Sequence, residues 1–126
     1  MGAMITRLAW FVGSFLLLSA CYVDAQGISI LELRNVQLVQ APAAVVHDPA
    51  GFPLAGVSVE EFSSDWKESL RSTKTDVAGA FSFSPVKGRE IYDFQLRMDG
   101  FDPLRVRVRM DRKHGRELRL EMILSS

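Results

Sequence analysis

The chain has 126 residues, enough for one small domain, and its 15 basic and 15 acidic side chains give a formal net charge of zero. A chain without excess positive charge has no overall field that attracts nucleic acid, so we expect no nucleic-acid partner. One Cys and two His are too few for a disulfide framework or for a zinc site of ordinary spacing. We therefore expect neither a metal nor a cofactor.

The first 21 residues have the pattern of an export signal. Arg7 is their only charged residue, and an apolar run over residues 8–18 follows it. This run is too short to cross a bilayer comfortably, which favours a signal peptide over a membrane anchor. We predict a signal-peptide helix here, which a cleaving peptidase would remove.

Two cleavage sites compete at the end of this segment. Leu-Ser-Ala-Cys at 18–21 resembles a bacterial lipobox, in which Cys21 is lipidated and becomes the new N-terminus. Val-Asp-Ala at 23–25, before Gln26, also fits an ordinary signal peptidase. Because the single Cys of the chain lies at the lipobox position, we favour a lipoprotein of the outer membrane or periplasm. The alternative is a soluble periplasmic or secreted protein.

The mature chain is interpreted as a leader followed by one β domain. Residues 22–42 have an irregular apolar pattern and are expected to form a leader or an edge strand, whereas residues 43–126 form the domain. In the domain, short alternating segments are separated by turn residues such as Asp-Pro-Ala-Gly at 48–51. These segments predict strands at 44–47, 57–62, 70–75, 81–83, 92–98, 104–110 and 118–124.

The clearest of these segments alternates with period 2. Tyr92, Phe94 and Leu96 are separated by Asp93 and Gln95, as in a strand with one buried face. Residues 104–110 and 118–124 show the same alternation, and no segment of the domain has a convincing amphipathic helical pattern. The sequence therefore predicts an all-β fold, a small antiparallel Greek-key β-sandwich of about seven strands.

The order of the motifs is similar to that of the carboxypeptidase regulatory-like domains. The resemblance covers roughly residues 43–124 and includes V-V-H-D-P-A-G-F-P-L-A-G-V-S-V-E, T-K-T-D-V-A-G-A-F-S-F and Y-D-F-Q-L-R-M-D-G-F. It implies a transthyretin-like β-sandwich without catalytic residues, in which the motif residues form turns and core. Residues in matching places are Asp48, Gly51, Pro53, Leu54, Gly56, Val57, Val59, Thr75, Asp76, Gly79, Phe81, Phe83, Gly100 and Phe101. Ring-cleaving dioxygenases of related topology bind iron through two Tyr and two His, but only Tyr92 lies in this domain.

A row of arginines is the first candidate for a binding surface. Arg105, Arg107 and Arg109 alternate along one predicted strand, about 6.8 Å apart, and Arg119 lies on the next strand. Such a row could bind an anionic envelope polymer through bidentate contacts. The simpler interpretation, which we favour, is a solvated face on which the arginines pair with glutamates 117 and 121.

Trp66 is the second candidate. With Phe62 it borders the polar segment 63–69, where the indole could stack on a sugar ring, but packing of the loop against the sandwich is the simpler expectation.

His47 and Asp48 could form an acid–base pair, yet neighbours in a strand point to opposite faces. His114 is expected in solvent.

These observations lead to one expected function and two alternatives. The first is a non-enzymatic exported module, a cell-envelope lipoprotein held to the membrane through Cys21 that contacts an envelope protein or surface. The second is a protein that binds carbohydrate or an anionic envelope polymer through Trp66 or the arginine row. An enzyme of transthyretin-like fold is the third.

Overall fold

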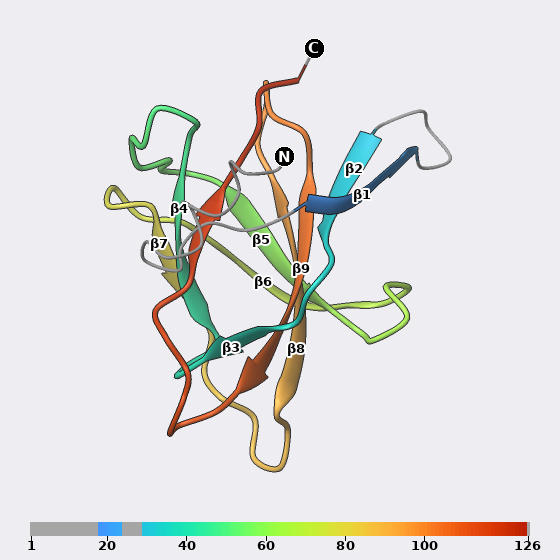
Figure 1. The fold of residues 1–126 in the computed structure, drawn as a ribbon, viewed down its shortest axis with the longest axis vertical. Coiled ribbons are helices and arrows are strands. Elements are labelled where there is room, and N and C mark those ends of the chain that lie inside the picture. The colour runs from blue at the N-terminus through green and yellow to red at the C-terminus, as the bar shows by residue number, and fades with distance from the viewer. Residues whose placement is uncertain (1–17, 24–28, 126) are drawn as a thin grey trace, which may run out of the picture.

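The computed structural model describes residues 18–23 and 29–125 and contains ten strands and no helix within them (Figure 1). The strands are β1 (Leu18–Val23), β2 (Ser29–Leu33), β3 (Gln37–Val39), β4 (Ala43–His47), β5 (Ser58–Phe62), β6 (Ser69–Lys74), β7 (Ala80–Ser82), β8 (Ile91–Arg97), β9 (Leu104–Met110) and β10 (Arg119–Glu121). No helix among these residues is long and apolar enough to cross a membrane.

The strands form two sheets, which confirms the predicted all-β sandwich. The larger sheet has the order β1-β2-β9-β8-β5-β6, with β3 also paired to β9, and the smaller has the order β10-β4-β7. The pairing is mixed: β2 and β3 run parallel to β9, and β10 runs parallel to β4, whereas the other pairs are antiparallel. The sequence predicts an antiparallel sandwich of about seven strands, and the three parallel pairs are where the structure differs from it.

The segment before the expected domain lies along β9. Leu31 of β2 pairs with Leu104 at the start of β9, and Gln37 of β3 pairs with Val108 near its end. One stretch of chain therefore accompanies most of β9 in the parallel direction, with a break between β2 and β3. The expected signal helix falls mainly on residues outside the described ones, but Leu18–Val23, which include Cys21, form β1 and pair antiparallel with β2.

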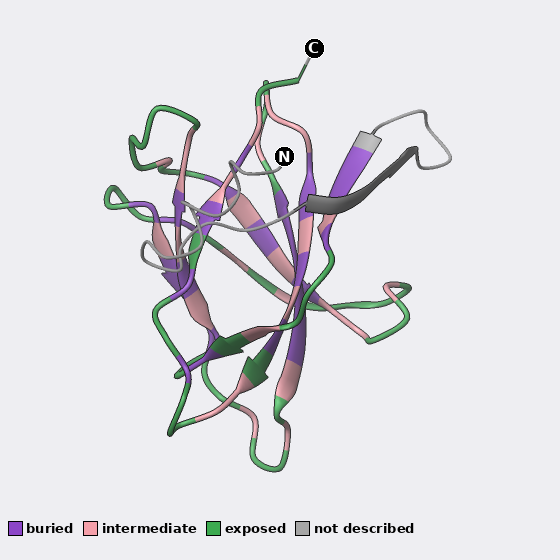
Figure 2. Cartoon of the chain, in the orientation of Figure 1, coloured by how far each residue is buried: buried purple, intermediate pink, exposed green. Residues whose placement is uncertain are grey.

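The core lies between the two sheets and is built on alternating apolar side chains (Figure 2). Phe94 of β8 is fully buried, and its ring centroid lies 5.5 Å from that of Phe81 and 5.4 Å from that of Phe83. These edge-to-face and stacked geometries are the ones that aromatic pairs prefer. The strand patterns around Phe81, Phe83 and Phe94 thus meet in one aromatic cluster that joins β7 to β8.

The turn at residues 76–79 connects β6 to β7 as the sequence predicts. Gly79 has a φ of 78°, and a Cβ atom at this position would lie 2.4 Å from the Val46 carbonyl oxygen. The Asp76 carboxylate accepts hydrogen bonds from the backbone N–H groups of Ala78 and Ala80. Only glycine fits this close approach of two chain segments.

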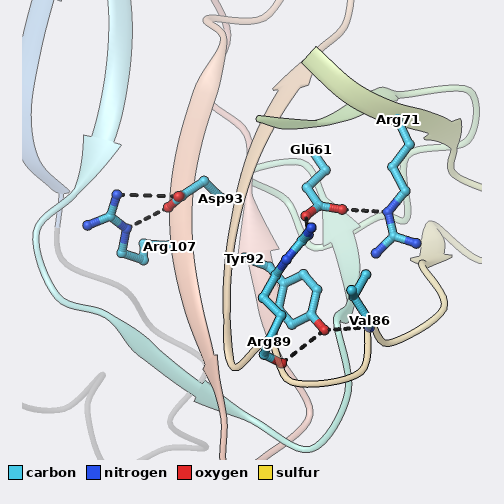
Figure 3. Close-up of polar contacts among 7 residues, drawn as sticks. All are labelled: Glu61, Arg71, Val86, Arg89, Tyr92, Asp93 and Arg107. Atoms are coloured by element: carbon cyan, nitrogen blue, oxygen red, sulfur yellow. Dashed lines mark hydrogen bonds and ion pairs between the residues drawn. The ribbon is translucent and has the colours of Figure 1, made fainter. Parts of the chain in front are cut away.

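A buried carboxylate interrupts the apolar pattern at one end of the core. Glu61 follows Val57 and Val59 on the inward face of β5 and is only 1% exposed. Its oxygens accept hydrogen bonds from Arg71 Nε, at 2.5 Å, and from Arg89 (Figure 3). Because a buried carboxylate without partners is costly, these two arginines are what allows Glu61 to occupy a core position.

Candidate functional site

The outward face of β8 is covered, although its sequence pattern is that of a strand with one buried face. Asp93 and Gln95 are each 2% exposed. In the antiparallel register of β8 and β9, Asp93 lies opposite Arg107 and Gln95 opposite Arg105. The arginine side chains of β9 lie over these two residues and bury them.

Arg107 is bound to Asp93 through two nitrogens. Its Nε lies 2.6 Å from Asp93 Oδ1 and its Nη2 lies 3.3 Å from Oδ2, the two-point contact that suits guanidinium and carboxylate (Figure 3). The hydrogen bond that Arg107 donates to Asp93 raises the pKa of Arg107 above its usual range. Arg107 Nη2 also donates to the Ser64 carbonyl oxygen at 3.0 Å, which ties the loop between β5 and β6 to β9.

The loop that carries Trp66 is held by its own hydrogen bonds. Ser63 N–H donates to the Glu68 carbonyl, and Trp66 N–H donates to the Ser63 carbonyl, both at 2.9 Å. The Asp65 carboxylate accepts the Ser63 hydroxyl at 2.6 Å and the Lys67 N–H at 3.1 Å, and these bonds lower the pKa of Asp65. The loop is therefore a defined turn on which Trp66 has a fixed position.

Trp66 has a backbone conformation that is unusual for a bulky residue. Its φ is 63°, in the left-handed region that favours glycine. The Arg105 guanidinium lies over the indole, 4.6 Å from its ring centroid, and the Phe62 ring lies 5.9 Å away at a tilt of 43°. Trp66 therefore packs against the sandwich, as the sequence predicts, and much of this contact is with Arg105.

Trp66, Arg105 and Arg107 line one open concavity of about 410 Å³. The sequence treats the tryptophan loop and the arginine row as separate surfaces, and the structure brings them together. The remaining lining residues come from β2 and the residues after it: Glu32, Leu33, Arg34, Asn35 and Val36. Their part in the site depends on the parallel pairing of β2 with β9, for which the sequence carries no local signal.

Two of the five candidate residues lie elsewhere. Arg109 is exposed near the end of β9, where its register partners are Ile91 and Leu38. Arg119 belongs to β10 in the smaller sheet, and its Nη2 lies 3.7 Å from Glu117 Oε1, with both side chains largely exposed. The expected pairing with glutamate thus occurs at Arg119, whereas Arg107 is paired with aspartate and Arg105 with glutamine.

The histidines and turn aspartates have structural partners. His47 Nδ1 lies 2.9 Å from the Asp48 carbonyl oxygen, while the Asp48 carboxylate accepts the N–H groups of Ala50 and Phe52. His114 is exposed, with its ring 3.4 Å from Asp111. Among the described residues, no three His, Cys, Asp or Glu side chains come together as a metal-binding group.

Cys21 lies in β1, opposite Leu31 of β2. The next residues of β2, Glu32 and Leu33, line the concavity. The predicted lipidation position is therefore one strand away from the edge of the concavity that Trp66 and Arg105 share.

No protein-family model matches the chain, and no curated protein matches it. The resemblance to carboxypeptidase regulatory-like domains consequently stays a prediction from the motifs.

The left-handed conformation of Trp66 makes a testable prediction. Both Trp66→Gly and Trp66→Ala lose the indole contacts, but only glycine also removes the steric conflict of a Cβ atom. We expect the glycine variant to be more stable than the alanine variant by about 1 kcal/mol, as measured by urea unfolding. The same pair of substitutions at the exposed Ser64 is the control and should not favour glycine. Equal stability of the two Trp66 variants would contradict the assigned backbone conformation.

Proposed function

We propose that this chain is a non-enzymatic, exported β-sandwich module of the carboxypeptidase regulatory-like kind, anchored in the cell envelope as a lipoprotein through Cys21. In this proposal it acts by binding an envelope protein at the concavity formed by Trp66, Arg105 and Arg107. The observation that carries the proposal is the convergence of these three side chains, from a loop and a strand, on one open surface.

The position of Cys21 supports this arrangement. Cleavage before Cys21 would leave residues 21–23 of β1, which pair with residues 29–31 of β2. Acyl chains on Cys21 would hold the chain stably at a membrane surface, since each methylene group buried in the bilayer contributes about 0.8 kcal/mol. The concavity would then lie close to that surface, where membrane-associated partners are concentrated.

The environments of the charged side chains support a binding role over catalysis. Among the residues whose burial is described, 30–125, the two buried acidic residues, Glu61 and Asp93, are each paired with arginine. His47 contacts a backbone carbonyl, and the Asp48 carboxylate is occupied by its own turn. A general base needs a position from which it can take a substrate proton, and these groups are instead engaged in the fold.

The mass of the mature N-terminus tests the anchor. After expression of the chain in a bacterial host, we expect a diacyl or triacyl adduct on Cys21 and recovery in the membrane fraction. Cys21→Ser should abolish both. An unmodified chain that begins at Gln26 would contradict the anchored form, because that cleavage removes Cys21, the residue that would carry the acyl chains.

A second candidate function is the binding of an acidic glycan or anionic envelope polymer at the same concavity. Guanidinium groups bind carboxylates, and Asn35 adds an amide at the rim. Because Arg105 covers one face of the indole, a sugar ring would contact the remaining edge of Trp66 while its carboxylate approached Arg105. This geometry favours acidic over neutral sugars.

Retention on immobilised polygalacturonate tests this candidate. We expect Trp66→Ala, which removes the contact with the sugar ring, and Arg105→Ala, which removes the charge-assisted contact, to weaken binding about tenfold each. Arg97→Ala, the substitution of an exposed arginine outside the concavity, should have no effect. Arg107 is not a suitable position, because its removal leaves the buried charge of Asp93 without its partner, whereas Arg105 is bound to the neutral amide of Gln95. If the two site variants bind like the parent, the concavity does not bind acidic glycans.

A further inference from the structure

A second pocket, of about 770 Å³, lies at the other end of β9, between the β7–β8 loop and the residues that follow β9. In Figure 1 these segments lie at the lower end of the molecule, away from β1 and β2. Its ionisable lining residues are Lys87, Arg89, Arg109, Arg112, Glu90 and Asp111. Four basic against two acidic side chains give the pocket an excess of positive charge in a chain whose net charge is zero.

The loop that carries Lys87 is fixed from inside the core. The hydroxyl of Tyr92, a side chain that is 1% exposed, accepts the Val86 N–H at 2.8 Å and donates to the Arg89 carbonyl at 3.2 Å (Figure 3). Arg89 N–H donates to the Val86 carbonyl at 3.0 Å and closes the turn. Lys87 is therefore presented from a loop that a buried tyrosine holds in place.

Arg89 is fixed as firmly as the loop backbone. Its guanidinium is ion-paired with the buried Glu61 and lies over the Tyr92 ring, 5.3 Å from the centroid. Glu61 also pairs with Arg71, so one carboxylate serves two guanidinium groups. Arg89 is therefore a fixed part of the pocket wall, and its charge is balanced at least in part by Glu61.

Asp111, one of the two acidic lining residues, is turned toward its own loop. The Asp111 carboxylate accepts the N–H groups of Lys113 and His114, and these bonds lower its pKa. Arg109 and Arg112, on either side of Met110 and Asp111, are both exposed. Within the described part of the chain, Lys87, Arg109 and Arg112 form no ion pair or side-chain hydrogen bond, although they line the same pocket as Arg89.

We propose that this pocket is a binding site for adjacent phosphate groups. Each phosphate presents several strong acceptor oxygens, and guanidinium groups bind them through two parallel hydrogen bonds. The three cations without carboxylate partners can contact the ligand, while Arg89 and Glu61 hold the wall in place. The concavity and the pocket share strand β9, where Arg107 of the concavity and Arg109 of the pocket are two residues apart, about 7 Å, but no residue lines both. None of the residues that line the pocket belongs to β1 or β2, so the proposal does not depend on lipidation of Cys21.

Calorimetric titration of the purified exported protein with pyrophosphate tests the site. We expect binding that weakens with salt, since the charges are exposed, and an affinity at least about tenfold lower in the double variant Arg109→Ala, Arg112→Ala. Arg97→Ala removes one exposed positive charge outside the pocket, and Trp66→Ala alters the other site, so both should bind pyrophosphate like the parent. Because both substituted arginines are exposed, the double variant should retain the unfolding midpoint of the parent.

Three results would overturn the proposal. The first is the absence of pyrophosphate binding by the parent protein, and the second is an equal loss of affinity in Arg97→Ala, which would show attraction by charge alone. The third is equally tight binding of polygalacturonate with the same dependence on Arg109 and Arg112, which would assign the pocket to polyanions in general rather than to phosphate. Failure of the polygalacturonate test at Trp66 and Arg105 leaves this site unaffected.

Discussion

The two-point contact between Asp93 and Arg107 organises the outward face of the larger sheet. The Arg107 guanidinium neutralises the buried carboxylate of Asp93. Its Nη2 also donates a hydrogen bond to the Ser64 carbonyl, which fixes the loop between β5 and β6. With that loop in place, Trp66 lies under Arg105, whose Nε is bound to the adjacent Gln95. The shape of the concavity thus depends on cross-strand pairs between β8 and β9, which fix both the arginines and the loop that carries Trp66.

The same strand, β8, also supports the loop that lines the second pocket. Asp93 points outward to Arg107, while the neighbouring Tyr92 points inward and holds the β7–β8 loop through its hydroxyl group (Figure 3). The buried Glu61 on the adjacent β5 then binds Arg89 in that loop. Two paired carboxylates, one on each side of the sheet, therefore fix one arginine in each proposed site: Asp93 holds Arg107 and Glu61 holds Arg89.

Local patterns were sufficient to predict much of the fold. Alternation around Tyr92, Phe94 and Leu96 predicted β8, and the turn at residues 76–79 was predicted from Asp76 and Gly79. What local patterns do not contain is the choice of partner strand. The parallel pairing of β2 and β3 with β9, which brings residues 32–36 to the concavity, depends on contacts between distant segments.

The sites show the same limit. Arginines at period 2 predicted a surface row, but their partners Asp93 and Gln95 follow from the register of β8 and β9. The alternation of Glu61 with Val57 and Val59 predicts that its side chain points into the core. The same pattern normally predicts an apolar residue at such a position, so it does not explain how a charged side chain is accommodated there. Trp66 also has a left-handed backbone conformation, which glycine adopts most readily, so this conformation could not be predicted from the sequence.

A double-mutant cycle between Asp93 and Arg107 tests most directly whether the outward face is built on this pair. We expect a coupling free energy of about 1–2 kcal/mol from urea unfolding of Asp93→Ala, Arg107→Ala and the double variant, because one partner is buried and the contact has two hydrogen bonds. The exposed pair of Glu117 and Arg119 provides the matched control, with an expected coupling of a few tenths of a kcal/mol, about the value for surface pairs. A coupling between Asp93 and Arg107 as small as that of the control would contradict the account.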